Sequence, residues 1–116
     1  MEAQRRKLRF YRTADGKVVV EEWLASLRDA RTRARLHIRL DRLEEGNLGD
    51  HRSVGGGVIE LREHFGSGYR IYLGLDGERV IILLCAGDKS TQARDIRIAQ
   101  GHWADYRAGK KQGGNT

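Results

Sequence analysis

The pattern of apolar and polar residues changes its period along the first half of the chain and so divides it into elements. The stretch KLRFYR, residues 7–12, alternates as a strand does and is followed by a turn around an Asp-Gly pair. Apolar residues from Val20 to Leu27 then recur at three- and four-residue steps, which predicts a short amphipathic helix. A second helix is predicted between Asp29, a suitable N-cap, and Gly46, a suitable stop.

Three strands are predicted in the second half, from the runs VIELREHF (58–65), YRIYLGL (69–75) and RVIILLCA (79–86). Short links that contain glycine join them, which implies an antiparallel meander because a parallel return needs a dozen or more residues. The third run is apolar on both faces, so we expect a central, buried strand. The segment before these strands, residues 50–57, is turn-like and ends in three glycines.

A final helix is predicted after these strands, with Ser90 or Thr91 as its cap. One stripe of this helix carries its apolar residues, Ile96, Ala99, Trp103 and Tyr106. We expect a single domain over residues 1–107 and a disordered tail over 108–116, because AGKKQGGNT has nothing to bury. The order β-α-α-β-β-β-α predicts an α+β fold in which helices pack on one face of a small, mostly antiparallel sheet.

The composition of the chain narrows the class of partner. Its 116 residues include 22 lysines and arginines against 16 acidic residues, a net charge of +6, which favours polyanions or acidic proteins. The chain is too short for a separate cofactor domain. No apolar run approaches the ~20 residues of a membrane span, and the basic N-terminus lacks a secretory signal, so we expect a cytoplasmic protein without a membrane partner.

The residues present argue against several chemistries. The only cysteine, Cys85, lies in the apolar run VIILLCAG, where a buried small hydrophobe is the expected role. The histidines have no spacing typical of metal ligands: His37, His51, His64 and His102. No phosphate-binding loop of the Walker type is present, and the GGG run leads directly into a strand, the wrong context for a dinucleotide fingerprint. We therefore expect no metal and no small-molecule cofactor.

The predicted strands place polar chemistry on one face of the sheet. Side chains alternate along a strand, so Arg62 and His64 share a face of one strand, and Arg70 and Tyr72 share a face of the next. If the turn pairs His64 with Arg70, then Arg62 lies opposite Tyr72, and all four stand on the face that the helices leave open. Such a cluster can bind phosphate through its guanidinium groups and stack a tyrosine on a base. The pattern equally permits Arg62 to pair with a glutamate of its own strand and Arg70 to be a solvated strand residue.

Two further groups of cations differ in their expected roles. Lys89 follows a buried strand at the start of a helix, where backbone N–H groups and its ammonium group can together hold a phosphate. Five arginines lie on the second predicted helix, and we expect them to form a solvated outer face rather than an RNA-contacting stripe. They are Arg31, Arg33, Arg35, Arg39 and Arg42.

The run GGGVIELREHFGSGYRIYLG, followed by ILLCAGDKSTQARDI, resembles the HigB-like "addiction module killer protein" branch of the RelE/ParE toxin superfamily, and the similarity covers roughly residues 8–106. The resemblance implies the RelE-like fold and the toxin half of a type II toxin-antitoxin pair, with a cognate antitoxin as protein partner. RelE-type relatives cut messenger RNA in the ribosomal A site. By that analogy the ribosome and mRNA are further partners, and Arg62, Arg70 and Lys89 match the motif cations of the family.

The resemblance also implies an endoribonuclease without metal. Arg62, Arg70 and Lys89 would bind the RNA phosphate and stabilise its charge, while Tyr72 or His64 would orient a base or transfer the proton. The terminal tyrosine and histidine of some relatives have no matched residue in this chain. Two alternatives stay open: a non-catalytic ParE-like poison of DNA gyrase, and a decayed toxin that only binds its antitoxin.

Overall fold

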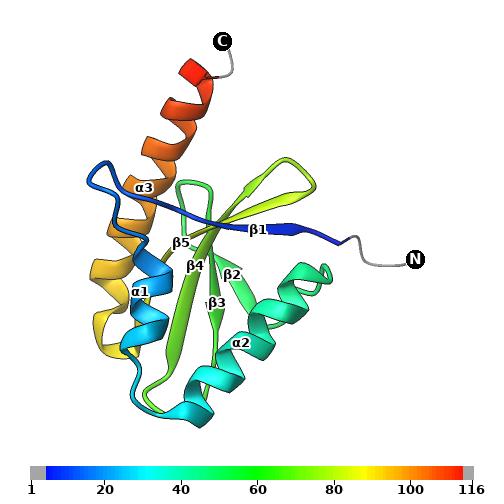
Figure 1. Cartoon of the computed structure of the whole chain (residues 1–116), viewed down its shortest axis with the longest axis vertical. Helices are drawn as coiled ribbons and strands as arrows, with labels where there is room; N and C mark the ends of the chain where they lie inside the picture. Colours follow the sequence, from blue (N-terminus) through cyan, green and yellow to red (C-terminus); the bar gives the residue numbers. More distant parts are fainter. Residues whose placement is uncertain (1–4, 114–116) are drawn as a thin grey trace.

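The predicted order of elements is confirmed, with one strand added. The computed structural model describes residues 5–113, of which 111–113 are described by their main chain alone (Figure 1). Its elements are β1 (Lys7–Phe10), α1 (Val19–Ser26), α2 (Ala30–Glu44), β2 (His51–Ser53), β3 (Val58–Arg62), β4 (Tyr69–Asp76), β5 (Val80–Asp88), the 3-10 turn η1 (Lys89–Thr91) and α3 (Gln92–Gly113). The added strand, β2, lies in the segment that was predicted to be turn-like.

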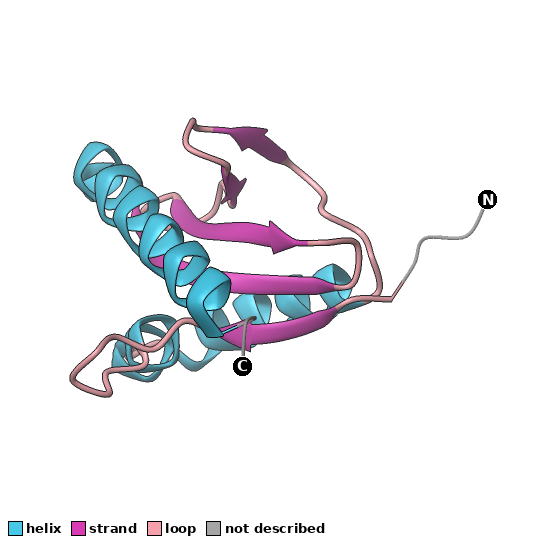
Figure 2. Cartoon of the chain, turned by 90° about the horizontal axis from the view of Figure 1, so that it is seen from above, coloured by secondary structure: helices cyan, strands magenta, loops and turns pink. Residues whose placement is uncertain are grey.

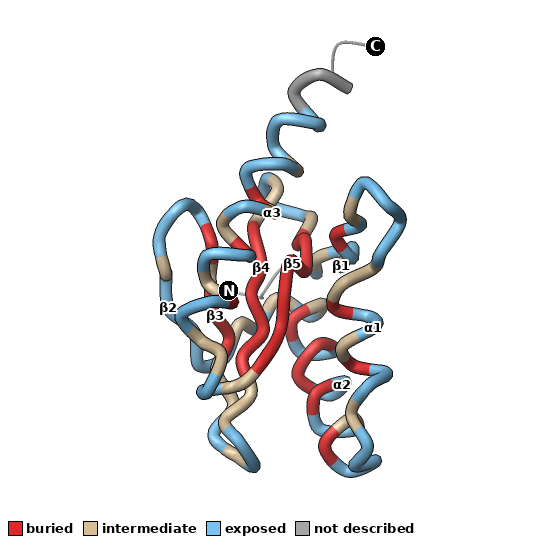
Figure 3. Tube along the Cα trace, turned by 90° about the vertical axis from the view of Figure 1, so that its left-hand side faces the viewer, coloured by how far each residue is buried: buried red, intermediate tan, exposed pale blue. Residues whose placement is uncertain are grey.

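The five strands form one sheet in the order β1-β5-β4-β3-β2. Strands β3 to β5 pair antiparallel, as predicted, and the added strand β2 pairs antiparallel with β3. Strand β1 pairs with β5 in parallel, with Leu8 opposite Ile81. A parallel pair needs a long connection, and the two helices and the meander between β1 and β5 provide it. The middle strand is β4, and β5 lies beside it with its apolar run buried, as the sequence predicted (Figure 3).

Helices cover both faces of the sheet, so the expectation that they pack on one face is corrected (Figure 2). Helices α1 and α2 pack on the face that carries Leu61, Ile71 and Leu83, while α3 packs on the opposite face, over Tyr72 and Ile82. The physical reason lies in β5, because a strand that is apolar on both faces needs cover on both. The α+β class of a RelE-like fold is confirmed.

Helix α3 packs close to the sheet because glycines lie beneath Trp103. A Cβ atom on Gly74 would lie 2.4 Å from Cε3 of Trp103, and one on Gly57 would lie 2.6 Å from its Nε1. Side-chain carbons do not approach other atoms so closely in a packed interior, so the indole ring can rest only on main chain. Gly57 also has a φ angle of +83°, which other residues rarely adopt.

The start of the last helical segment is set by Asp88, not by the predicted caps Ser90 or Thr91. The Asp88 side chain accepts a hydrogen bond from the main-chain N–H of Ser90 at 2.8 Å, and the Asp88 N–H donates to Thr91 Oγ1 at 3.3 Å. This reciprocal arrangement satisfies N–H groups that have no partner inside the helix. It also fixes where the chain turns out of β5.

The other end of α3 lies beyond its predicted boundary. The helix continues to Gly113, although a disordered tail was predicted from residue 108. Residues 114–116 of that predicted tail lie outside the described residues. The Oη of Tyr106 donates to Asp76 Oδ2 at 2.6 Å, which ties this part of α3 to the end of β4.

Candidate nucleic-acid interface

The two arginines of the β3–β4 hairpin, Arg62 and Arg70, lie directly opposite each other. The predicted pairing of Arg62 with Tyr72 is wrong by two residues, because Tyr72 lies opposite Glu60. A shift of two keeps each side chain on its predicted face of the sheet, whereas a shift of one would have reversed it. The hairpin loop sets this register, and it includes Gly66 in the left-handed region, with a φ angle of +57°.

Like charges placed opposite each other on a sheet repel, and here the two guanidinium groups turn to different partners. Arg62 Nη2 donates to Asp50 Oδ1 at 2.8 Å. Arg70 is only 7% exposed, and its Nη1 donates to the carbonyl oxygens of Glu63 at 3.2 Å and Tyr69 at 3.0 Å. Its Nε has no hydrogen-bond partner in the part of the chain that the structure describes. Arg70 is therefore held in place by main-chain oxygens and forms no ion pair with a described carboxylate.

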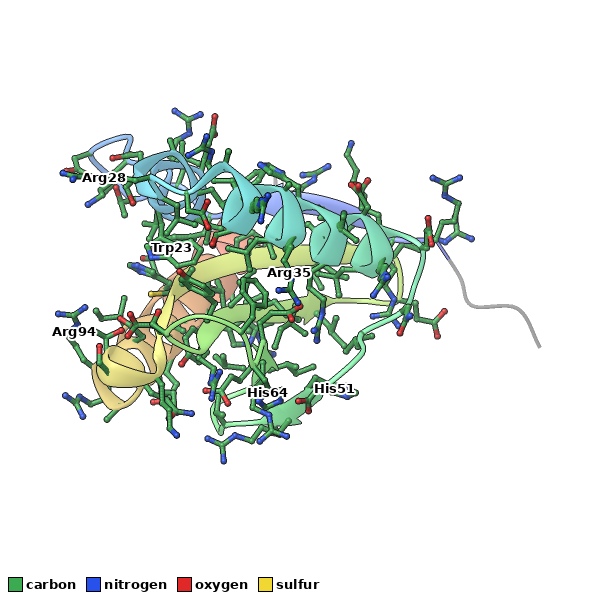
Figure 4. The ribbon with its side chains drawn as sticks, turned by 90° about the horizontal axis from the view of Figure 1, so that it is seen from below. Trp23, Arg28, Arg35, His51, His64 and Arg94 are labelled. Carbon is green, nitrogen blue, oxygen red and sulfur yellow. The ribbon has the colours of Figure 1, made fainter. Side chains whose placement is uncertain are left out.

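Asp50, in the segment before β2, links Arg62 to His64. Its second oxygen, Oδ2, lies 2.6 Å from Nε2 of His64, an exposed side chain labelled in Figure 4. The hydrogen bonds from His64 and from Arg62 lower the pKa of Asp50 to about 2. The pairing of Arg62 with a glutamate of its own strand does not occur, since Glu60 and Glu63 bind other arginines.

Lys89, the third predicted cation, lies close to Arg70, because the residue between their side chains is a glycine, Gly68. A Cβ atom on Gly68 would lie 3.4 Å from Lys89 Cβ and 3.5 Å from Arg70 Nη1, so both side chains border that glycine. The Lys89 N–H donates to the Ser67 carbonyl at 3.4 Å, which fixes the contact. Lys89 is exposed and pairs with no carboxylate among residues 5–110. The structure thus brings together Arg62, Arg70 and Lys89, which we name the cation row.

Tyr72, the predicted base-stacking or proton-transfer residue, is fully buried beneath α3. Its Oη donates to Glu60 Oε2 at 3.0 Å. Burial, together with the carboxylate of Glu60, raises the pKa of Tyr72 above its ordinary value. The expectation that Tyr72 stands on an open face is wrong because α3 covers this part of the sheet. The alternation of side chains along one strand shows which residues share a face, but it does not show which face a distant helix covers.

A further arginine on this face, Arg52 of β2, was missed from the sequence. Glu60 accepts hydrogen bonds from Arg52 Nε and from Gln92 Nε2, both at 2.9 Å, as well as from Tyr72. Burial alone would raise the pKa of Glu60, but the three hydrogen bonds outweigh it and hold the pKa below its ordinary value. Arg52 is 48% exposed and shares its sheet face with Arg62. The signal that could have found it is the triplet HRS before the glycine run, which can return onto β3 as a hairpin.

Arg39 contradicts the expectation of a solvated arginine face on α2, since it is only 8% exposed. Its Nη1 donates to the Arg62 carbonyl at 3.1 Å and to Glu63 Oε1 at 2.9 Å. Its Nη2 donates to the carbonyls of Leu48 at 2.8 Å and Asp50 at 2.7 Å. One buried guanidinium thus ties together main-chain oxygens of the loop after α2 and of the end of β3. Arg39 therefore positions the main chain of Arg62 and of its partner Asp50. The expectation holds for the exposed residues Arg31, Arg35 and Arg42.

Cys85 is buried on β5, as its apolar surroundings predicted, and burial raises the pKa of its thiol to about 11. Among residues 5–110, no group of three or more histidine, cysteine, aspartate or glutamate side chains is placed to hold a metal ion. No helix in the described part of the chain is both long enough and apolar enough to cross a membrane.

Comparison with known protein families places the chain in one of them. A family model described as "Phage derived protein Gp49-like (DUF891)" matches residues 22–103, from within α1 to Trp103 of α3. The chain belongs to the Gp49-like family. This is a family of RelE/ParE-like toxins. The matched region of the Gp49-like protein includes β2 to β5 and η1, and so contains the whole cation row.

A relative of this Gp49-like protein occurs in Haemophilus influenzae (strain ATCC 51907 / DSM 11121 / KW20 / Rd) and is described as "Uncharacterized protein". It is 46% identical over 80 residues, which are 69% of this chain and 81% of the relative. No solved structure matches the Gp49-like chain. Family membership therefore rests on the sequence, and the arrangement of the side chains comes from the fold described above.

Proposed function

We propose that this Gp49-like protein is a HigB-like toxin of a type II toxin-antitoxin pair. In this proposal it is a cytoplasmic endoribonuclease that cuts messenger RNA on the ribosome, and a cognate antitoxin neutralises it. The observation that carries the proposal is the cation row, where the end of β3, the start of β4 and the end of β5 meet. The phosphate backbone of RNA is attracted to such a row by the positive charge of the row and by the paired donors of each guanidinium group.

The proposed reaction is attack of a ribose 2′-hydroxyl on the adjacent phosphate, with cleavage of the bond from phosphorus to the 5′-oxygen. Negative charge accumulates on the phosphate in the transition state, and each well-placed donor accelerates such a step by about 10²- to 10³-fold. Arg70 suits this role because main-chain carbonyls hold it before RNA arrives. Arg62 can exchange its ion pair with Asp50 for one with the phosphate. Lys89 forms no ion pair with a described carboxylate, so it can bind the phosphate without first breaking one.

Proton transfer in this proposal falls to His64. Tyr72 is no longer part of the proposal, because α3 covers its side chain completely and its hydroxyl donates to Glu60. His64 is exposed, and its contact with Asp50 orients the ring as a carboxylate orients a histidine base. One histidine is a modest acid-base apparatus, so cleavage of free RNA is expected to be slow. Alignment of the mRNA by the ribosome would contribute several kcal/mol.

A second function is favoured by the burial of Tyr72. Without that tyrosine, the cation row presents charge to the surface beside a single histidine, as a protein-binding surface can. This arrangement fits a non-catalytic, ParE-like poison that binds an acidic surface of DNA gyrase. The two functions differ in what happens to cellular RNA after induction.

Induced expression in a bacterial host without the antitoxin tests the proposal. The wild-type chain is expected to arrest growth, and primer extension on cellular transcripts is expected to show new, codon-phased 5′ ends. Arg62→Ala and Lys89→Ala remove accessible side chains, so both should fold and lose the arrest. Arg70→Lys keeps a charge at the buried position and should lose it as well, because lysine lacks the planar fork. Lys17→Ala, at an exposed position after β1, is the matched control and should stay toxic.

Full toxicity of Arg62→Ala and Lys89→Ala, at matched expression and with unchanged thermal unfolding, would contradict a role for the cation row. DNA damage with intact transcripts would instead support the gyrase poison. Absence of arrest with the wild-type chain would indicate a decayed toxin that only binds its antitoxin.

A further inference from the structure

A small groove lies between α2 and the loop that follows β3, on the side of the sheet away from α3. Its volume is about 210 Å³, and its lining residues are Arg35, Ile38, Arg39, Arg42, Glu63 and Phe65. Figure 4 shows the molecule from below the view of Figure 1 and labels Arg35 of this groove. The proposed nuclease reaction uses none of these side chains.

The charge in this groove is positive and largely unpaired. Glu63 is its only acidic side chain, and Arg39 already binds it at 2.9 Å. Arg39 is buried, yet its Nε has no hydrogen-bond partner within the described residues. Arg35 and Arg42 are exposed, and neither forms an ion pair with a carboxylate of residues 5–110. The groove thus has donors for at least two carboxylates.

An exposed apolar residue lies between Arg35 and Arg42, the two arginines of the groove that form no described ion pair. Ile38 is 50% exposed, and Arg35 and Arg42 are three residues before and four residues after it, so all three share one face of α2. Phe65 adds an aromatic ring, but the Arg35 guanidinium already lies over that ring, 3.7 Å from its centre. The accessible apolar contact in the groove is therefore aliphatic.

We propose that this groove docks an acidic peptide segment of the cognate antitoxin, which places one apolar side chain against Ile38 and carboxylates beside Arg35 and Arg42. The identity of the partner as an antitoxin rests on the proposed function, whereas its acidic and apolar chemistry rests on the groove. RNA fits less well, because a base finds the Phe65 ring already covered and a phosphate gains nothing from an exposed isoleucine. An acidic segment with an apolar anchor satisfies both features.

A segment bound in this groove would affect the geometry of the cation row through Arg39. This residue lines the groove, and it also donates to the main-chain carbonyls of Arg62 and Asp50. A partner carboxylate that draws the Arg39 guanidinium toward the groove would disturb the position of Arg62. The antitoxin could in this way weaken the site from the opposite side of the sheet.

The test is fluorescence anisotropy on the full chain with two labelled probes, a twelve-residue helical peptide of glutamate and leucine and a twelve-nucleotide single-stranded RNA. The peptide is expected to bind the wild-type chain, and the double variant Ile38→Ser with Arg42→Glu should bind it at least about tenfold more weakly. The matched control is Ile98→Ser with Arg97→Glu, a pair on α3 that is also exposed and undergoes the same change in charge, which should weaken binding by no more than about twofold.

Equal weakening in both double variants would overturn the proposal, because general attraction to a basic chain would then explain the binding. Loss of RNA binding in the groove variant with peptide binding unchanged would overturn it too and would make the groove an RNA surface. Failure of the peptide to bind the wild-type chain has the same consequence. None of these readouts needs RNA cleavage, so failure of the nuclease proposal leaves the result intact. The groove variant should still arrest growth.

Discussion

Arg62 donates a hydrogen bond from Nη2 to Oδ1 of Asp50 at 2.8 Å, so one member of the cation row already forms an ion pair with a carboxylate. The other oxygen of Asp50 lies 2.6 Å from His64. Exposed ion pairs of this kind contribute little to stability. A phosphate that approaches Arg62 can therefore take the place of Asp50 Oδ1 on that guanidinium group, while Asp50 Oδ2 keeps its contact with His64.

Asp50→Asn is expected to strengthen binding of a twelve-nucleotide single-stranded RNA about two- to fivefold at low salt, because it removes a competing charge beside Arg62. Since the pKa of Asp50 is lowered to about 2, the carboxylate is charged at every pH from 5 to 8, and the effect should persist over that range. Asp41→Asn, at an exposed position on α2, makes the same change in charge elsewhere. An equal gain in both variants would show that Asp50 does not compete with RNA.

Arg39→Met is expected to lower the free energy of unfolding by about 2 to 4 kcal/mol, because it removes a buried guanidinium that donates to three main-chain carbonyls and to Glu63. The carbonyls concerned include those of Arg62 and Asp50, so affinity for RNA should fall as well. Urea unfolding measures the first effect. Arg31→Met, exposed on the same helix, should stay within about 0.5 kcal/mol of the wild type. A similar small loss in both variants would mean that the Arg39 contacts contribute no net stability.

Glu60→Gln is expected to flatten the dependence of stability on pH in the acid range. The folded-state pKa of Glu60 lies below the ordinary value of 4.5, so its ionised form stabilises the fold above that pH and the contribution is lost as pH falls further. Urea midpoints between pH 3 and pH 7 should therefore fall less steeply for Glu60→Gln than for the wild type. Glu45→Gln, exposed after α2, should follow the wild-type curve. Parallel curves for Glu60→Gln and the wild type would contradict this role.

Gly74→Ala is expected to destabilise the fold by about 1 to 3 kcal/mol or more, because the added methyl group meets the Trp103 ring and overpacks the interface of α3. Gly101→Ala is the matched substitution within α3, where nothing lies within 4 Å of the new atom. It should raise stability by about 0.5 to 1 kcal/mol through helix propensity. Thermal unfolding of both variants checks the prediction, and a stable Gly74→Ala chain would mean that α3 can move away from the sheet.

Several features could be predicted because they depend on neighbours along the chain. The Asp29 cap of α2 is confirmed by its hydrogen bond from the N–H of Arg31. Leu36, Leu40 and Leu43 are buried, and their four- and three-residue spacing in the sequence places them on one face of this helix. Arg62 and Arg70 share a face of the sheet even though the register differs by two, because side chains alternate along each strand. Periodicity, helix capping and turn residues depend on interactions over a few positions of the chain. The elements that they determine can therefore be predicted from the sequence.

The tertiary structure alone decided which of those side chains meet solvent and which partners they have. The apolar faces of β5 called for cover on both sides, but only the packed fold shows that α3 lies over Tyr72 and removes it from the surface. In the same way, Arg39 turns inward to four oxygens from residues nine to twenty-four positions away, and Asp50 reaches Arg62 twelve positions along. These contacts depend on where distant segments come to rest, and local patterns of residues do not encode that position.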